Sequence, residues 1–255
     1  MIKASSDSNV RQFKTHKNSV GHTAISGCPE PTEGDGGCVS VCYADKLANF
    51  RPSVDALLNH NHRLLRGAKD KEEIKKLLRP TISNSEAQYE RRASRLEGHD
   101  HRMLTRRGHI FRYQWSGDVI TIEHAKAIRE LGYEFPDTTF WLYTRTWWAV
   151  KALLGAKNVI VNLSVDPVNE KIMHSVWRGL YRHKNLRISW MASTGASDAL
   201  DTLPKWIGNT RKALLCPENI HKLEVEGACH KCGLCLHSKN KYDVVFITKK
   251  ARISR

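Results

Sequence analysis

The sequence has no apolar run approaching the roughly 20 residues that a membrane-spanning helix needs, and its mean hydropathy is −0.49. Its opening residues, MIKASSDSNVRQFKTHKNS, are polar and lack the apolar segment of a secretory leader. Fixed-period repeats and low-complexity segments are also missing. We therefore expect a cytoplasmic protein without a membrane partner, in a compartment that keeps thiols reduced.

Acidic residues are scarce beside basic ones: 26 Asp and Glu face 41 Lys and Arg, and the formal net charge is +15. Such a surface attracts polyanions, and nucleic acid is the usual one. No compact reader module such as a helix-turn-helix is apparent. The candidates for phosphate contact are arginines of one charged segment, Arg91, Arg92, Arg95, Arg106 and Arg107. The alternatives are a solvated surface helix there, and a charge that serves solubility or an acidic protein partner.

Short apolar strands alternate with amphipathic helices from residue 109 onward, which predicts parallel β-α-β units. We expect one α/β domain over 1–255, forming a partial or complete (β/α) barrel, with a helical basic insertion at 68–108 and a cysteine-rich segment at 211–240. A further strand is predicted at 18–26, and Pro80 is predicted to end the helix that begins near Asp70. The other predicted strands are 109–115, 138–144, 158–166, 185–193, 211–216 and 242–250, and the predicted helices are 41–67, interrupted near Pro52, 121–132, 147–156 and 169–183.

Polar residues follow several of these strands. Parallel β-α units bind ligands at the carboxyl ends of their strands, so the polar groups there are expected to converge on one rim. The candidates are Ser116, Gly117 and Asp118 after one strand, and Ser164 and Asp166 after another. The alternative is that these residues form helix-entry turns, with Asp118 near a helix N-terminus and Arg145 paired with an acid of the rim.

Four of the seven cysteines, Cys216, Cys229, Cys232 and Cys235, lie within twenty residues. The C-x2-C-x2-C run with one remote cysteine beside a proline follows the ligand logic of a ferredoxin-type [4Fe–4S] cluster. Gly227 and Gly233 would permit the turns around it. The alternative is a structural zinc site, in which His230 or His237 could replace a cysteine.

The other three cysteines, Cys28, Cys38 and Cys42, flank a Gly-rich loop and the helix after it. Three thiolates on a four-iron cluster leave one iron without a protein ligand, and an open metal position is where a small molecule can bind. Two alternatives stay open: Cys42 packs in the core, or the trio is a zinc site completed by His22, Asp35 or Asp45.

A strand, a cysteine loop and a helix beginning CYADK resemble the opening of radical S-adenosylmethionine enzymes. WSGD (115–118) stands where that family's glycine- and acid-containing motif binds the cofactor's amine, and NLSVD (162–166) where a serine–acid pair contacts it. The resemblance implies S-adenosylmethionine as a cofactor and an auxiliary cluster at the C-terminal cysteines. The N-terminal spacing here is C-x9-C-x3-C, against C-x3-C-x2-C in that family.

A second resemblance covers most of the chain. The succession of the N-terminal cysteines, SGD, FWLYTRT and the C-terminal cysteines is similar to a phage-encoded cysteine-cluster protein family, which implies the host cytoplasm as its location. We interpret the chain as an iron–sulfur protein with unknown catalytic residues and substrate. The alternatives are a non-enzymatic, metal-stabilised nucleic-acid-binding protein, and an electron-transfer protein served by a host or viral reductant.

Overall fold

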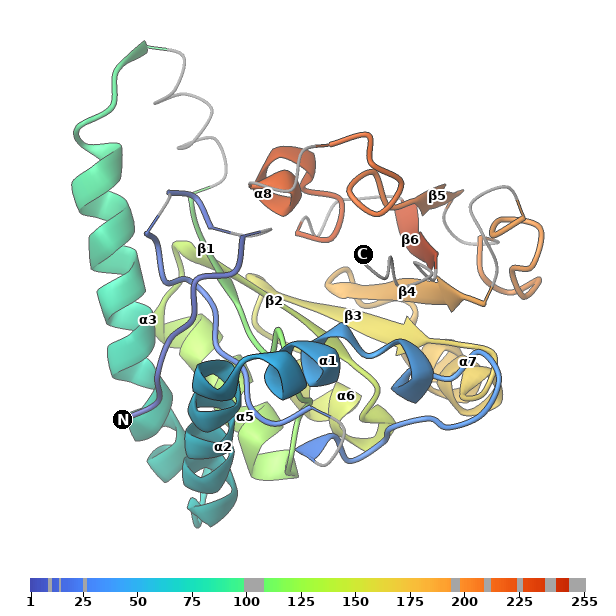
Figure 1. Cartoon of the computed structure of the whole chain (residues 1–255), viewed down its shortest axis with the longest axis horizontal. Helices are drawn as coiled ribbons and strands as arrows, with labels where there is room; N and C mark the ends of the chain where they lie inside the picture. Colours follow the sequence, from blue (N-terminus) through green and yellow to red (C-terminus); the bar gives the residue numbers. More distant parts are fainter. Residues whose placement is uncertain are drawn as a thin grey trace.

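The fold is built on a single six-stranded parallel sheet, whose strand order is β1-β2-β3-β4-β6-β5 (Figure 1). The computed structural model describes residues 1–8, 11–13, 15–24, 27–98, 108–193, 198–208, 212–223, 227–236 and 242–247. The strands are β1 (His109–Arg112), β2 (Thr138–Thr144), β3 (Val159–Val165), β4 (Leu186–Ala192), β5 (Lys212–Leu215) and β6 (Tyr242–Ile247). Each described pair is parallel.

The sheet is open. Among the described residues, β1 and β5 lie at its two edges and do not pair with each other, so the predicted parallel α/β architecture is confirmed and the predicted complete barrel is wrong. The last strand, β6, inserts between β4 and β5, with Ser189 opposite Val244 and Leu215 opposite Val245. Hydropathy predicts that such a strand exists but not which strands it pairs with, because all inner strands of a parallel sheet are apolar on both faces.

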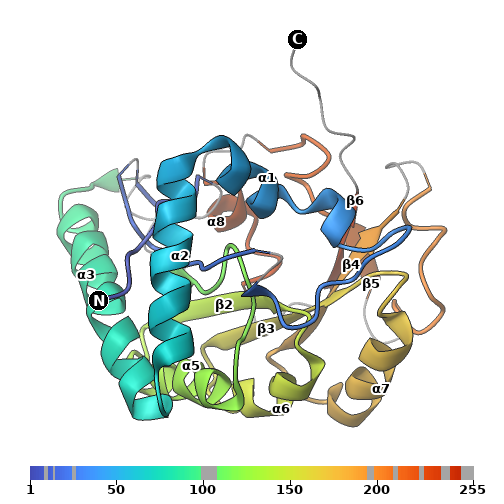
Figure 2. The ribbon, with the colours of Figure 1, turned by 60° about the horizontal axis from the view of Figure 1, so that its bottom comes forward.

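Helices cover one face of the sheet, which we call the outer face; Figure 2 shows α5, α6 and α7 beneath the strands. The helices of this side are α5 (Ile122–Glu134), α6 (Val150–Leu153) and α7 (Glu170–Leu180). Three further helices precede the sheet in the chain: α1 (Tyr43–Phe50), α2 (Pro52–Gly67) and α3 (Lys71–Ala93). Alternate strand residues such as Phe140, Leu142 and Val161 point into this core and are fully buried. No described helix is long and apolar enough to cross a membrane.

The other face, the inner face, carries Ile110, Trp141, Ile160 and their alternate neighbours. It is covered by the cysteine-rich segment, whose Leu236 packs against these three side chains. That segment contains the short helix α8 (Ala228–Cys232), which lies on the side of the sheet away from α5 to α7 (Figures 1 and 2). The two faces thus divide the chemistry: apolar packing outside, cysteines inside.

Helix α3 contradicts the prediction that Pro80 ends it. It begins at Lys71, after the N-cap Asp70, whose side chain accepts a hydrogen bond from Glu73 N, and it continues through Pro80 to Ala93. An interior proline costs about 3 kcal/mol because it removes one helical hydrogen bond and crowds the preceding turn. Burial of Ile74, Leu78 and Ile82 against the shared core offsets that cost. Part of the predicted basic insertion therefore packs into the same core as the sheet.

The predicted strand at 18–26 is also wrong in its extent. Ser19 forms single bridges with Ser5 and Arg112, and Val20 N donates to the Arg112 carbonyl at 3.1 Å. Backbone hydrogen bonds continue along β1 and the residues after it, from Asn18, which accepts from Arg112 N, to His22, which donates to Ser116, but no regular strand forms; residues 25–26 lie outside the described residues. The predicted break near Pro52 is confirmed, because Pro52 starts α2 directly after α1 ends.

Candidate metal and ligand site

The four C-terminal cysteines gather on the inner face of the sheet. Cys229 and Cys235 pack against the Trp141 and Ile160 cluster, and Cys216 follows β5, its N–H donating to the Val245 carbonyl at 2.8 Å. All seven cysteines of the chain are half-buried and free of disulfides. Two glycines in the left-handed conformation bracket α8, Gly227 at φ 67° and Gly233 at φ 71°, and allow the tight turns that bring these thiols together.

These four thiols influence one another electrostatically. Burial raises the pKa of Cys229 well above its usual value, and Cys235 adds to the increase. Burial likewise raises the pKa of Cys235 to about 12, with further contributions from Cys216 and Cys232. A catalytic nucleophile needs the opposite shift, toward the thiolate. A bound metal would supply the missing positive charge and deprotonate such thiols, so the four thiols are donors of the chemical type that a metal centre uses.

Arg112 and Tyr143 lie beside this group. The Arg112 guanidinium stacks over Trp141 at 5.0 Å and over Tyr143 at 5.6 Å, and it forms an ion pair with Asp7 at 2.6 Å. The Tyr143 hydroxyl hydrogen-bonds the Cys235 thiol, which favours the thiolate. The inner face therefore offers the cysteines a positive charge and a hydrogen-bond donor.

The three N-terminal cysteines lie in a loop over the carboxyl ends of the strands. Cys38 is fixed by Thr32: its N–H donates to Thr32 Oγ1 at 2.9 Å, and Thr32 N donates to Cys38 Sγ at 3.3 Å. Burial raises the pKa of Cys28 and of Cys42, and Cys38 contributes to both increases. Cys38 is thus within electrostatic reach of the other two.

The glycines of this loop allow it to pack tightly. Gly36 has φ 79°, and a Cβ there would lie 3.0 Å from Pro167, directly after Asp166. A Cβ at Gly37 would lie only 2.5 Å from the Thr32 carbonyl. The loop therefore closes on itself and on the end of β3, which places Cys38 above the rim.

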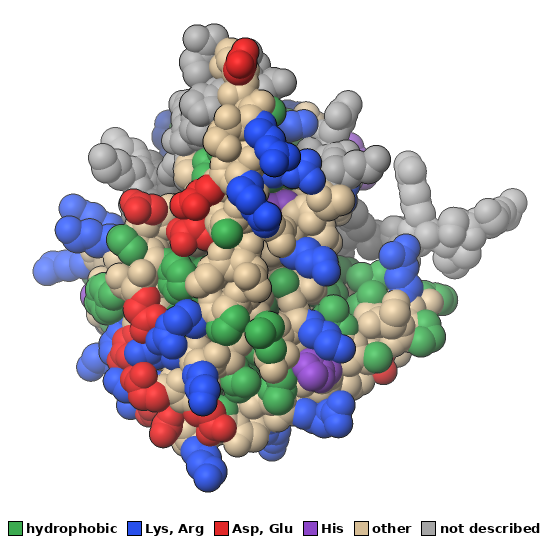
Figure 3. Space-filling model, turned by 90° about the vertical axis from the view of Figure 1, so that its left-hand side faces the viewer, with side chains coloured by type: hydrophobic (Ala, Val, Ile, Leu, Met, Phe, Trp, Pro, Cys, Tyr) green, Lys and Arg blue, Asp and Glu red, His purple; other side chains and the backbone are tan. Residues whose placement is uncertain are grey.

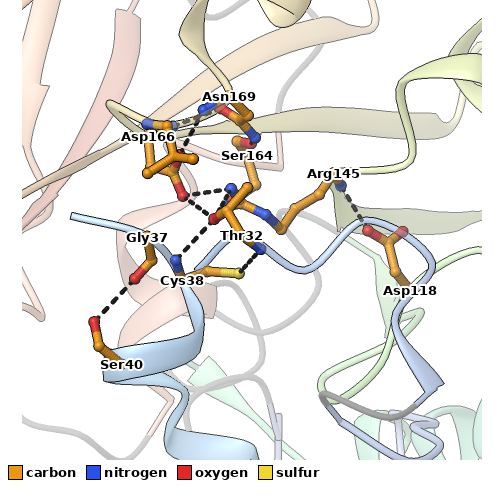
Figure 4. Close-up of polar contacts among 10 residues, drawn as sticks. Thr32, Gly37, Cys38, Ser40, Asp118, Arg145, Ser164, Asp166 and Asn169 are labelled. Atoms are coloured by element: carbon orange, nitrogen blue, oxygen red, sulfur yellow. Dashed lines mark hydrogen bonds and ion pairs between the residues drawn. The ribbon is translucent and has the colours of Figure 1, made fainter. Parts of the chain in front are cut away.

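An ion pair between Arg145 and Asp166 forms the centre of that rim (Figure 4). Thr32 Oγ1 donates to Asp166 Oδ2 at 2.6 Å and accepts from Arg145 Nη2 at 2.8 Å. Asp166 is fully buried, and its other oxygen accepts from the N–H groups of Val168 and Asn169. Ser164 lies next to the pair, with Arg145 Nη1 at 3.4 Å from its hydroxyl.

Asp118 is held by protein groups on both oxygens. It accepts from Thr144 Oγ1 at 2.7 Å, from Val119 N at 2.6 Å and from Arg145 N at 2.6 Å. Burial raises the pKa of its carboxyl group, whereas these hydrogen bonds lower it. Asp118 also contributes to the raised pKa of Cys28, so it lies near the N-terminal cysteines.

Ser116 and Gly117 both contact His22, a residue of the same protein. The Ser116 hydroxyl donates to the His22 carbonyl at 2.8 Å, and His22 Nε2 donates to the Asp118 carbonyl at 2.6 Å. A Cβ at Gly117, which has φ 76°, would lie 2.3 Å from the His22 ring. The missing side chain of Gly117 makes room for this histidine, so these contacts explain the SGD motif without a ligand.

Sequence reasoning anticipated the convergence of Asp118, Ser164 and Asp166 on one rim and the pairing of Arg145 with an acid there. It missed Thr32, whose loop carries no signal of a strand end. Within the described ranges, no three His, Cys, Asp or Glu side chains are placed to hold one metal ion. Of the alternative zinc ligands, Asp45 accepts from Asn49 Nδ2 at 3.2 Å, and His237 lies outside the described residues.

Comparison with known proteins gives one family. The family described as Gene product 88 matches residues 3–238. The Gene 88 protein of Mycobacterium phage L5 is 28% identical over 241 residues, covering 91% of this chain and 87% of that protein. The Gene 88 protein of Mycobacterium phage D29 is 27% identical over 242 residues, covering 91% and 88%. No solved structure matches.

Proposed function

The chain belongs to the Gene product 88 family, as the match over residues 3–238 shows, and we propose that it is an iron–sulfur protein. The expected phage-encoded family is thereby confirmed; the metal chemistry is our proposal. The observation that carries it is the gathering of Cys216, Cys229, Cys232 and Cys235, free of disulfides, on one face of a parallel sheet.

An iron–sulfur cluster suits these four cysteines better than zinc does. Three of them follow one another with two residues between neighbours, as in ferredoxin-type sites, whereas zinc sites usually pair two separate C-x2-C segments. A four-iron cluster with four thiolates is anionic, and hydrogen bonds to its sulfurs set its potential. Arg112 supplies a compensating charge at this face, and Tyr143 supplies such a hydrogen bond.

A second cluster at Cys28, Cys38 and Cys42 is the further part of the proposal. Its support is the electrostatic coupling of Cys38 to both neighbours and the position of their loop over the rim. Three ligands leave one iron open, and S-adenosylmethionine is the ligand that the radical S-adenosylmethionine resemblance implies there. Ser164, only partly buried, is the candidate for contact with its ribose.

The other rim residues that were predicted to bind the cofactor are already engaged with groups of the protein. Asp166 already pairs with Arg145, and Asp118 already accepts three hydrogen bonds from the chain. Ser116 and Gly117 are likewise engaged with His22. We therefore propose that Asp118 and Asp166 position the rim and the arginine, and that a ligand meets the rim through Ser164 and the open iron.

Anaerobic purification with iron, sulfide and zinc analysis tests the metal assignment. Two four-iron clusters predict about eight iron atoms per chain and a brown protein. The variants Cys232→Ser and Cys38→Ser serve as each other's control, because each should lose about four iron atoms and keep the other cluster. A colourless protein that contains zinc would overturn the iron–sulfur proposal. Iron content unchanged by Cys38→Ser would overturn the second cluster alone.

Binding of S-adenosylmethionine is tested separately, by equilibrium dialysis with the reconstituted protein. Cys38→Ser should abolish binding, and Cys232→Ser should retain it. Formation of 5′-deoxyadenosine with dithionite as reductant would identify an enzyme. Binding without that product would contradict catalysis, and a reversible redox couple would then favour electron transfer with a host or viral reductant as partner.

A further inference from the structure

A cavity of about 390 Å³ lies at the C-terminal end of α3, and no cysteine is among its described lining residues. Three arginines and polar or aromatic side chains line it, with no carboxylate among the described lining residues. These are Phe13, Thr15, His16, Gln88, Arg91, Arg92 and Arg95. Figure 3 shows a group of Lys and Arg side chains on the upper part of this face of the molecule, with Asp and Glu side chains beside it and further side chains of both signs below.

The arginines of the cavity differ from the basic residues at the other end of the same helix. There Lys75 and Arg79 form ion pairs with Glu134 of α5, at 3.1 and 2.8 Å. Arg91, Arg92 and Arg95 form no ion pair with any Asp or Glu of the part of the chain that the structure describes. Their positive charge is available to an outside anion.

The cavity is also built rather than incidental. The Arg92 guanidinium lies 5.8 Å over the Phe13 ring, and its Nη2 donates to Thr15 Oγ1 at 3.2 Å. His16 is 2% exposed; its Nε2 donates to the Ser85 carbonyl at 3.0 Å. Its buried Nδ1 has no hydrogen-bond partner among the described residues. An N-terminal segment and a helix end thus converge on one basic hollow.

Helix electrostatics explain only part of this arrangement. Basic side chains in a last turn are favoured by the helix dipole, which accounts for Arg91 and Arg92. The dipole does not account for Phe13, Thr15 and a buried His16 closing the other side. Guanidinium groups bind phosphate through paired N–H donors, and hydroxyl and amide groups such as those of Thr15 and Gln88 complete such sites.

We propose that this cavity binds a backbone phosphate of nucleic acid. The net charge of +15 would bring a polyanion to the surface, and the three arginines would fix one position along it. A free phosphate compound shares the same chemistry, so the experiment has to separate the two sources. The proposal does not depend on the iron–sulfur function.

The test uses the full-length protein and fluorescein-labelled 20-nucleotide single-stranded DNA and RNA, by fluorescence anisotropy over a range of salt. The variant is R91Q/R92Q/R95Q. Its matched control, K171Q/R178Q/K184Q, removes the same charge from exposed residues in and after α7, away from α3 (Figure 1). The cavity variant should lose at least tenfold in affinity, with a salt slope shallower by about 0.7, the contribution of the one phosphate contact that it loses. The control should lose less than threefold.

Each further outcome decides the matter. Equal losses in both variants would mean general charge rather than a site and would overturn the proposal, as would absence of binding by the parent protein. Binding of inorganic phosphate to the parent protein that the cavity variant loses, while its affinity for nucleic acid stays that of the parent, would assign the cavity to a small phosphate compound instead. The conservative variant R91K/R92K/R95K keeps the charge but not the paired donors. Its affinity for nucleic acid should lie between those of the parent protein and the Gln variant, which would show that the loss in the Gln variant is not due to unfolding.

Discussion

The two faces of the sheet follow different rules although they share the same strands. On the outer face, Phe140 and Leu142 pack with the helices in an apolar core. One residue along, Trp141 and Tyr143 face the cysteine segment, and Arg112 stacks over both. The outer face gains most of its stability from apolar burial. The inner face keeps charge, hydrogen-bond donors and thiols in a buried place, which folding alone does not require.

The rim joins the two faces, and its ion pair should be the most sensitive point of the molecule. Asp166→Asn keeps an oxygen for the Val168 and Asn169 N–H groups but leaves Arg145 buried without a counter-charge. Breaking a buried ion pair typically costs about 3–5 kcal/mol. We expect that loss in the free energy of unfolding by urea denaturation. The double variant R145M/D166N should recover part of it, and a loss below about 1 kcal/mol in D166N would show that the pair is solvated.

Leu142 tests whether the outer face is independent of the cysteines on the inner face. Leu142→Ala opens a cavity in the outer core, where the side chain is fully buried, and should cost about 2–5 kcal/mol. Its iron content should stay that of the parent protein, since the residue faces away from the cysteines. Thermal unfolding and iron analysis on the same samples measure both. Loss of iron together with stability would mean that the two faces are not independent.

Acid should weaken the outer side through His109, at the start of β1. Burial, together with the nearby His16, lowers the pKa of His109 to about 3. The imidazole ring is hydrogen-bonded by Ser85 and Thr138 and flanked by Tyr89. Thr138 in turn donates a hydrogen bond to Glu86. The unfolded chain takes up the proton near pH 6.5 and the folded one near pH 3, so stability falls as pH drops below 6.5.

The expected cost of this proton is about 2 kcal/mol at pH 5 relative to pH 7. His109→Gln should reduce the pH dependence by that amount, measured as the difference between urea denaturation curves at the two pH values. His183→Gln, at an exposed position, is the control and should leave it unchanged. An unaltered pH dependence in His109→Gln would show that folding does not lower the pKa of His109.

Much of the sheet could be predicted from sequence because its strands are short apolar runs between clear turns. The strand at 138–144 agrees in both bounds. Pro80 misled because a local rule was applied to a helix whose stability comes from contacts with residues far away in the chain, such as Glu130 and Glu134. The placement of β6 inside the sheet likewise depends on tertiary pairing, which no local pattern encodes.

The candidate site divides in the same way. Cysteine spacing predicted two groups, and each contains thiols within electrostatic reach of one another. The assignment of Gly117 to a ligand stays a prediction; the structure adds that His22, from a segment about a hundred residues earlier, fills the space beside it. Thr32 and Tyr143 could not be anticipated, because their roles depend on which strand ends and thiols the fold brings beside them.

The smallest expected effect separates a structural inner face from a functional one. Tyr143→Phe removes the hydroxyl that hydrogen-bonds Cys235 and little else. Such a bond to a charged sulfur contributes about 1 kcal/mol, and for a one-electron couple about 1.4 kcal/mol corresponds to about 59 mV. Because the bond favours the reduced, more negative cluster, the potential should fall by roughly 40 mV, measured by redox titration of the visible spectrum. Tyr133→Phe, at an exposed tyrosine of α5, is the matched control. If Tyr143→Phe leaves the potential unchanged but lowers the melting temperature, the inner face serves packing as the outer face does, and the contrast between them disappears.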